Sequence, residues 1–140
     1  IMLKNNLGKT VTVVDSDGST FTREFQLVAV ANGGYCGGGF HSAPESKLDV
    51  GLLDLSRIKK VSRTKFLRLV GHYKNGTHLK TRLGKKVVNY SQTTSVELRF
   101  PDETNVCIDG EILKLHEARF RVIPRSILFL LPVGTEIKSK

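Results

Sequence analysis

Residues 10–31, TVTVVDSDGSTFTREFQLVAVA, predict the fold class of this chain more directly than any other stretch. The first six of these residues alternate and are rich in β-branched side chains, which is typical of a strand, and DSDG at residues 15–18 is typical of a tight hairpin turn. The alternation resumes at residue 20 and places Phe21, Phe25 and Leu27 on related faces. The stretch therefore predicts two antiparallel strands joined by a short turn.

The rest of the chain repeats this pattern of strands between turn signals. One amphipathic helix is expected at residues 62–73, because apolar residues recur there at helical spacing after a capping Ser62. Residues 32–39 contain too many glycines for a regular element. Further strands are expected at residues 51–58, 86–100, 105–108 and 119–131, with a turn at residues 101–104 and a break at Pro124. The pattern predicts a mainly β chain, an antiparallel β-sandwich with one amphipathic helix.

Length and composition fit one folded domain. The 140 residues are 39% hydrophobic and 25% charged, which suits a globular domain and excludes a chain that is disordered as a whole. No apolar stretch approaches the roughly 18 residues needed to cross a bilayer, and the first residues do not resemble a signal peptide. Cys36 and Cys107 are too few for a disulfide framework and have no partner at metal-ligand spacing. These features predict a cytoplasmic protein with reduced thiols.

Basic residues are concentrated in the middle of the chain. Lys and Arg total 22 against 13 Asp and Glu, giving a net charge of +9, and residues 57–86 contain eleven basic residues and no acidic one. The basic residues that fall on the expected helix lie mainly off its apolar stripe. An ordinary solvated helix face and a surface that meets phosphates or anionic lipid both account for this placement. The charge favours an anionic partner without choosing among nucleic acid, a phosphorylated ligand and a membrane.

Common catalytic motifs are missing from the sequence. The glycines of residues 32–39 are not followed by the Lys and Ser or Thr of a P-loop, and a β-bulge or a close crossing of backbones explains them equally well. The four histidines show no metal-ligand pairing. Carboxylates do occur at strand ends, where turns explain them but where general bases and metal ligands are also presented: Asp49, Asp54, Asp109 and Glu111.

Four motifs follow one another in a characteristic order: VAVANGGYCGGG at residues 28–39, AP at 43–44, LDVGLLD at 48–54 and IDGE at 108–111. In this order they resemble the C-terminal domain of the lipid kinase family that contains bacterial diacylglycerol kinases, sphingosine kinases and ceramide kinases. The resemblance covers roughly residues 27–132. It implies that residues 1–140 form a single, truncated second domain of a two-domain kinase. The N-terminal nucleotide domain, with its Gly-Gly-Asp-Gly-Thr motif, is absent from this chain, which is therefore expected to be inactive alone.

The resemblance also implies catalytic roles. Glu111 corresponds to the family's acceptor of the lipid hydroxyl proton, and Asp109 precedes it and helps to orient the loop. A base at this position suits phosphoryl transfer, which needs the attacking hydroxyl positioned and relieved of its proton. The implied reaction, a step of phospholipid and lipid metabolism, converts ATP and a lipid alcohol into a lipid phosphate and ADP. Diacylglycerol, sphingosine-like bases and polyprenols all suit it.

A Mg²⁺ site of the family, built partly from backbone carbonyls, corresponds to Lys47, Val50 and Leu52. Val50 stands where the family has Asp, and valine has no side-chain ligand. Asp49 is the candidate substitute, because Mg²⁺ prefers carboxylate oxygens and bound water.

The resemblance sets the expected partners as well. They are a lipid alcohol, ATP with Mg²⁺, the protein's own nucleotide domain and an anionic membrane, at which a cytoplasmic protein would bind peripherally. The alternative is a non-catalytic basic β-module that binds nucleic acid. Against it, the three tyrosines do not pair into a stacking platform, and the chain has no Trp and no ribonucleoprotein-type motif. We therefore expect no nucleic-acid partner.

Overall fold

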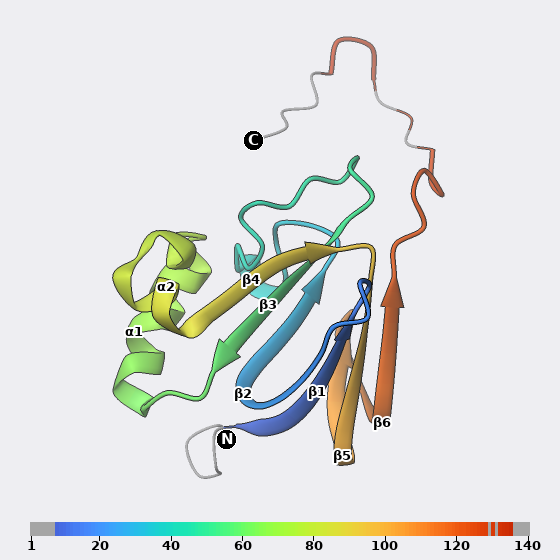
Figure 1. Ribbon diagram of the computed structural model, residues 1–140. Helices are drawn as coiled ribbons and strands as arrows, with labels where there is room; N and C mark the ends of the chain where they lie inside the picture. Colours follow the sequence, from blue (N-terminus) through green and yellow to red (C-terminus); the bar gives the residue numbers. More distant parts are fainter. Residues whose placement is uncertain (1–7, 129, 131, 136–140) are drawn as a thin grey trace.

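The computed structural model describes residues 8–128, 130 and 132–135. Six strands in this part of the chain form one antiparallel sheet in the order β4-β3-β2-β1-β5-β6 (Figure 1). The strands are β1 (Lys9–Asp15), β2 (Thr20–Ala31), β3 (Leu53–Lys59), β4 (Val88–Thr93), β5 (Ser95–Ile108) and β6 (Glu111–Arg121). The helices are α1 (Arg63–Lys74) and α2 (Arg82–Val87), with two short 3₁₀ turns, η1 (Gly37–Gly39) and η2 (His78–Lys80). The expected mainly β, antiparallel class is confirmed.

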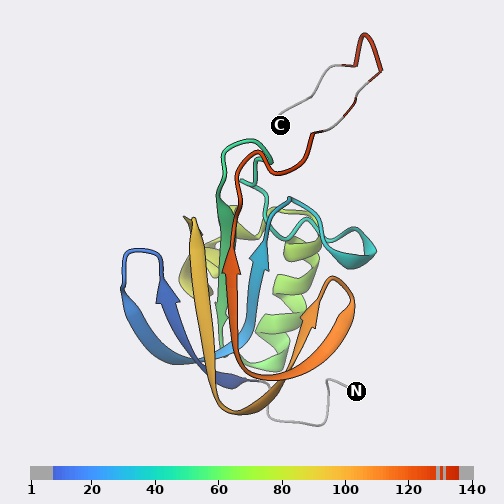
Figure 2. The same cartoon turned by 90° about the vertical axis from the view of Figure 1, so that its right-hand side faces the viewer.

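Strand β2 is long enough to belong to both halves of the sheet. Its first half pairs with β1 and its second half pairs with β3, and the register shifts between Phe25 and Leu27. An irregularity of this kind bends a strand and increases its twist. Figure 2 shows the resulting curve of β2, through which the sheet folds back on itself.

Thr93, at the end of β4, connects the two halves of the folded sheet. Its hydroxyl lies 2.6 Å from Asp15 Oδ1 and 2.8 Å from both Ser16 Oγ and the Ser95 carbonyl. β4 is an edge strand and β1 is three positions away in the strand order, so this contact requires the sheet to curl. Only Thr94 separates β4 from β5, and the chain passes between the halves at that sharp corner.

The fold has two hydrophobic cores, one on each face of β3. The main core contains buried residues from four strands: Val11, Val13, Phe25, Leu55, Val96 and Leu98. The second core joins Ile58 of β3 and Val88 of β4 to Leu69 and Tyr73 of α1. Leu55 and Ile58 lie on opposite faces of their strand because side chains alternate along it. The helices therefore cover the face of β3 that the main core does not use (Figure 1).

Several expected boundaries are confirmed and others are wrong. Residues 10–15, 20–31 and 51–58 correspond to β1, β2 and β3, and the expected helix corresponds to α1. Residues 82–87, which include the start of an expected strand, form α2 instead, so the chain has a second helix. Thr81 caps α2, since its side-chain oxygen accepts a 2.9 Å hydrogen bond from the Gly84 N–H.

The β5–β6 hairpin differs from the expectation in two ways. Residues 101–104 lie within β5 rather than in a turn between strands. Between the pairs Arg99↔Glu117 and Thr104↔Leu115 the register advances five residues along β5 but only two along β6, which leaves three extra residues on β5 and makes a large bulge. The last strand begins at Glu111 and ends at Arg121, so the strand expected at residues 119–131 is mostly wrong, although residues 129 and 131 lie outside the described residues.

Candidate functional site

Asp109 and Gly110 form a two-residue turn between β5 and β6, which closes with the pair Ile108↔Glu111. Their φ angles are 48° and 96°, and two successive positive values are typical of a type I′ hairpin turn. A Cβ on Gly110 would meet nothing within 4 Å, so conformation rather than space favours glycine there. The turn places the exposed Glu111 at the first position of β6.

Beyond the large bulge in β5, residues 104–115 form a segment that we call the distal hairpin. Figure 2 shows it, in orange, curving away from the later part of β6. The pairs Val106↔Leu113 and Ile108↔Glu111 place these four side chains on one face, because opposed and alternate residues of an antiparallel pair share a face. Val106 and Ile108 are half-buried and Leu113 is 43% exposed. A carboxylate therefore stands at the end of an apolar face.

The residues of the expected Mg²⁺ site lie in the connection between η1 and β3. The side chains of Lys47, Asp49 and Val50 are exposed, and Leu52 is half-buried. Neighbouring Gly51 has a φ of +68°, and a Cβ there would lie 3.1 Å from Pro124 Cγ. The loop thus packs against the segment that follows β6.

This loop and Glu111 are at different ends of β6, since Pro124 follows the strand and Glu111 begins it. The structure does not bring Asp49 and Glu111 together. Among the described residues there is no group of three or more His, Cys, Asp or Glu side chains that could hold a metal. The donor types that Mg²⁺ uses are nevertheless present in the loop, as the Asp49 carboxylate and backbone carbonyls, with water completing the shell.

The glycine-rich segment of residues 32–39 forms a turn in which glycines have a structural role. Gly38 and Gly39 have φ angles of 70° and 75°, and a bridge between Cys36 and Phe40 closes the turn. The backbone N–H of His41 donates a 3.0 Å hydrogen bond to the carbonyl of Lys74, the last residue of α1. The turn is thereby attached to the helical layer.

Asp54 has a structural role that the sequence did not reveal. It lies inside β3 with 1% of its surface exposed, although a turn was expected to explain it. Tyr90 and Gln92 on the adjacent strand β4 both donate hydrogen bonds to Asp54 Oδ1, and the second bond measures 2.9 Å. Burial and the Asp54 contact raise the pKa of Tyr90. The one signal for this role was the position of an Asp within the apolar run LLDL.

Comparison with known proteins identifies the family. The model of the YegS C-terminal NAD kinase beta sandwich-like domain matches residues 6–131. The chain belongs to this family. A probable lipid kinase YegS-like protein from Shewanella frigidimarina is 29% identical over 119 residues, which cover 85% of this chain and 37% of that protein. Diacylglycerol kinase from Bacillus subtilis is 25% identical over 127 residues, which cover 91% of this chain and 41% of the enzyme.

Solved structures support the same relationship. Two structures of a putative diacylglycerol kinase from Bacillus anthracis resemble this fold with TM-scores of 0.67 and 0.64, each at 25% sequence identity. The matched region makes up 88% and 87% of this YegS-like chain, but only 41% and 38% of the two solved chains. The YegS-like chain therefore spans about two fifths of its relatives, which are lipid kinases by name. No helix of the described residues is long and apolar enough to cross a bilayer.

Proposed function

We propose that this chain is the lipid-binding domain of an ATP-dependent kinase that phosphorylates a lipid hydroxyl, such as that of diacylglycerol. Membership of a lipid kinase family supports the reaction class, and two named relatives support the substrate class. The observation that carries the proposal is the position of Glu111 at the end of the apolar face of the distal hairpin. A lipid alcohol needs these two features together, an apolar contact for its chain and a base for its hydroxyl.

In the proposed reaction the lipid chain lies along Val106, Ile108 and Leu113, which brings its hydroxyl to the Glu111 carboxylate. The lipid oxygen forms a bond to the γ-phosphorus of ATP, and the bond from that phosphorus to the bridging oxygen of ADP breaks. The hydroxyl proton passes to Glu111. Phosphoryl transfer depends mainly on positioning and charge stabilisation, so the base acts by orienting the hydroxyl and removing its proton. Asp109 shapes the turn that holds Glu111.

The nucleotide is proposed to bind to a separate nucleotide domain, as the family resemblance implies. In the loop before β3, the carbonyls of Lys47, Val50 and Leu52 and the carboxylate of Asp49 would hold Mg²⁺. When bound there, Mg²⁺ would neutralise negative charge and stiffen the loop. We expect this chain alone neither to bind ATP nor to transfer phosphate.

The test is a kinase assay on an enzyme that joins this chain to its nucleotide domain, with diacylglycerol in mixed micelles. Glu111→Gln should lower kcat by roughly 10²- to 10⁴-fold, the usual contribution of a general base. The KM for ATP and the thermal unfolding temperature should not change, because the nucleotide is proposed to be held by the separate domain and the Glu111 side chain is exposed rather than packed in a core. Asp109→Asn, the matched control in the same turn, should have a milder effect. Wild-type turnover by a stable Glu111→Gln enzyme would remove Glu111 from the mechanism.

The metal part of the proposal has its own readout. Asp49→Asn should raise the Mg²⁺ concentration needed for half-maximal activity, and Val50→Asp should lower it. An unchanged Mg²⁺ dependence in both variants would show that this loop holds no ion, and would leave the proposed role of Glu111 intact.

A further inference from the structure

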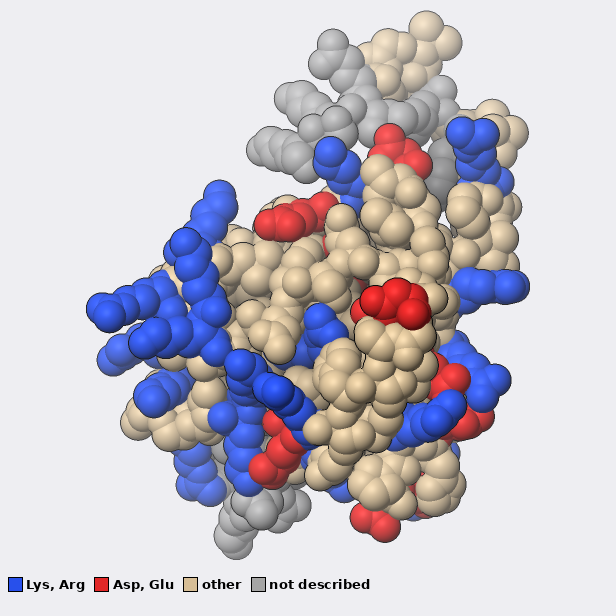
Figure 3. All heavy atoms as spheres, viewed as in Figure 1, with Lys and Arg blue, Asp and Glu red and all other residues tan. Residues whose placement is uncertain are grey.

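Eight exposed basic side chains from three consecutive helices form one surface, which we call the basic helical face. They are Arg63, Lys65, Arg68 and Lys74 of α1, Lys80 of η2, and Arg82, Lys85 and Lys86 of α2. Figure 3 shows Lys and Arg side chains gathered over α1 and α2 on the left of the view. No Asp or Glu occurs between residues 55 and 96, so these helices contribute no negative charge of their own.

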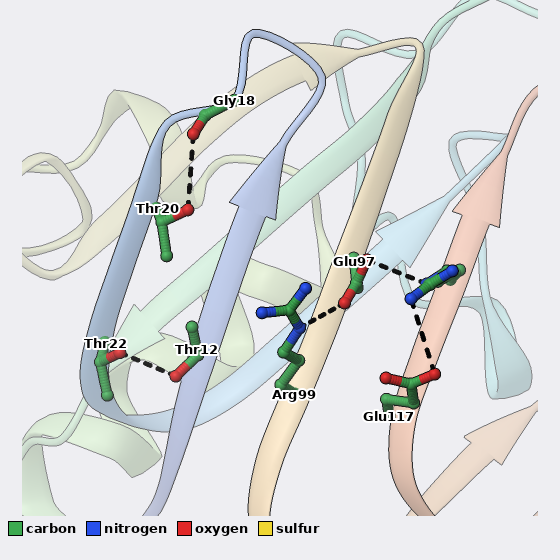
Figure 4. Close-up of polar contacts among 8 residues, drawn as sticks. Thr12, Gly18, Thr20, Thr22, Glu97, Arg99 and Glu117 are labelled. Atoms are coloured by element: carbon green, nitrogen blue, oxygen red, sulfur yellow. Dashed lines mark hydrogen bonds and ion pairs between the residues drawn. The ribbon is translucent and has the colours of Figure 1, made fainter.

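The basic helical face differs from the other charged surface of the molecule, the outer face of β5 and β6. There, Glu97 forms ion pairs with both Arg99 and Arg119, and Arg119 also lies 3.7 Å from Glu117 (Figure 4). These two arginines lower the pKa of Glu97 through hydrogen bonds and charge. Among the described residues, none of the eight cations of the basic helical face forms an ion pair. Positive charge is balanced on the sheet and left unbalanced on the helices.

Not every basic residue of this region belongs to the surface. Arg57 is only 8% exposed, donates a 2.9 Å hydrogen bond to Ser91 Oγ, and lies 4.9 Å from the centre of the Phe21 ring. Lys60 forms an ion pair with Glu24. Lys59 is the last residue of β3 and is half-buried. The eight that remain face solvent from the helices, and eight like charges on neighbouring turns repel one another unless an anionic partner is present.

An exposed leucine indicates which anionic partner fits. Leu67 is 66% exposed on α1, while Leu69 and Tyr73 of the same helix are buried in the second core. Helical spacing places Leu67 beside Arg63, four residues before it. Helices that lie in a membrane interface bind anionic lipids through Lys and Arg and bury exposed apolar side chains such as Leu at the boundary of headgroups and acyl chains. Single-stranded nucleic acid favours exposed aromatic rings for stacking, whereas Phe66 is half-buried and Tyr73 is buried.

We infer that the basic helical face docks on an anionic lipid bilayer, with its cations at the headgroups and Leu67 inserted among them. The inference extends the proposed function, because a kinase of lipid alcohols meets its substrate at a membrane. It does not depend on Glu111. Vesicles that contain no substrate lipid therefore test the docking surface separately from the chemistry.

The first experiment compares two triple variants of this chain on vesicles of phosphatidylcholine and phosphatidylglycerol. Lys65→Gln, Arg68→Gln and Lys85→Gln together should raise the dissociation constant about 100-fold, since each cation at an anionic surface contributes about a fivefold factor. The matched control removes the same charge from exposed sites elsewhere, through Lys9→Gln, Lys114→Gln and Arg125→Gln, and should change binding less than about threefold. Equal losses in the two variants, at equal thermal stability, would overturn the inference in favour of a non-specific effect of net charge.

The second experiment places a reporter at the proposed insertion point. The sequence has no Trp, so Leu67→Trp supplies a single fluorophore at that site. Its emission should shift to shorter wavelength with the anionic vesicles and stay unchanged with pure phosphatidylcholine, while Ile123→Trp, at a site 63% exposed after β6, should not shift with either. No shift at position 67, or equal shifts at both positions, would contradict the inference. Binding to a single-stranded oligonucleotide but not to vesicles would replace the membrane with nucleic acid as the partner.

Discussion

Strand β3 and the distal hairpin are both formed by antiparallel pairing, but their side chains differ in burial. In β3 the six residues from Leu53 to Ile58 are all buried, three on each face, against the main core on one side and α1 on the other. In the distal hairpin no residue is buried, although the segment contains Val106, Ile108, Ile112, Leu113 and Leu115. Strand β3 is paired on both sides, with β2 and β4, whereas the two strands of the distal hairpin pair only with each other. The two segments also differ in what covers their apolar side chains.

The difference separates the part of the fold that supplies stability from the hairpin to which we assign the proposed lipid site. Each fully buried aliphatic side chain stabilises the fold by about 1.5 to 3 kcal/mol, so the two cores around β3 carry most of the folding free energy. We call these cores, with the strands and helices that hold them, the packed frame. The distal hairpin contributes little packing, and segments with few buried contacts are those that open locally and bind ligands. Matched substitutions in the two regions can test this division.

The largest effect is expected for Leu55→Ala. Leu55 is fully buried, and its removal leaves a cavity in the main core, which should lower the free energy of unfolding by about 3 to 5 kcal/mol. The matched change Leu113→Ala in the distal hairpin should cost less than about 1 kcal/mol, because that side chain is 43% exposed. Urea denaturation of the two variants gives both values. Similar costs would show that the hairpin is part of the packed frame.

A smaller effect is expected for Gly84→Ala in α2. A Cβ on Gly84 would lie 1.7 Å from the carbonyl oxygen of His78, so the backbone must move, at a cost of about 2 to 3 kcal/mol. Gly110→Ala in the hairpin turn meets no atom within 4 Å and should cost only the strain of its positive φ, about 1 kcal/mol. Melting temperatures rank the two variants. The reverse order would contradict the close packing of α2 on η2.

The smallest effect concerns His78, which is fully buried and whose two ring nitrogens have no hydrogen-bond partner. Burial lowers the pKa of His78 below its ordinary value of 6.5. Below pH 6.5 the unfolded chain therefore binds more protons at this ring than the folded chain does. The stability due to the neutral ring is present above pH 6.5 and is lost as the pH falls below it. His78→Phe should reduce the drop in melting temperature between pH 7 and pH 5 by about 3 °C. The control His116→Gln, at an exposed position of β6 that follows the distal hairpin, should leave that drop unchanged.

The sequence predicts those elements whose pattern is local. The alternation in residues 10–15 and 20–31 identified β1 and β2, and the spacing of Phe66, Leu69 and Tyr73 identified α1. The strand expected from residue 86 starts too early, because residues 82–87 form a helix that Thr81 caps and whose Leu83 packs against the second core. That second cause is a long-range contact, which the local pattern does not contain.

The same limit applies to the candidate site. The Asp109–Gly110 turn could be predicted, since an Asp-Gly pair readily adopts the two positive φ angles that it needs. Residues 101–104 have a composition that suits either a turn between two strands or a large bulge within one strand. Only the pairing of β5 with β6 shows that they form a bulge. The separation of Asp49 from Glu111 depends on the path of the whole chain and could not be predicted from either motif.

Hydrogen exchange of this chain tests the division between frame and hairpin most directly. Amides of Val13 and Leu55, in the packed frame, should exchange only through global unfolding, whereas those of Val106 and Leu113 should exchange at least about 100-fold faster through local opening of the distal hairpin. Mass spectrometry of peptides from each segment would measure both rates at pH 7. Equal protection in the two segments would contradict the account, because the hairpin that carries Glu111 would then be as firmly folded as β3.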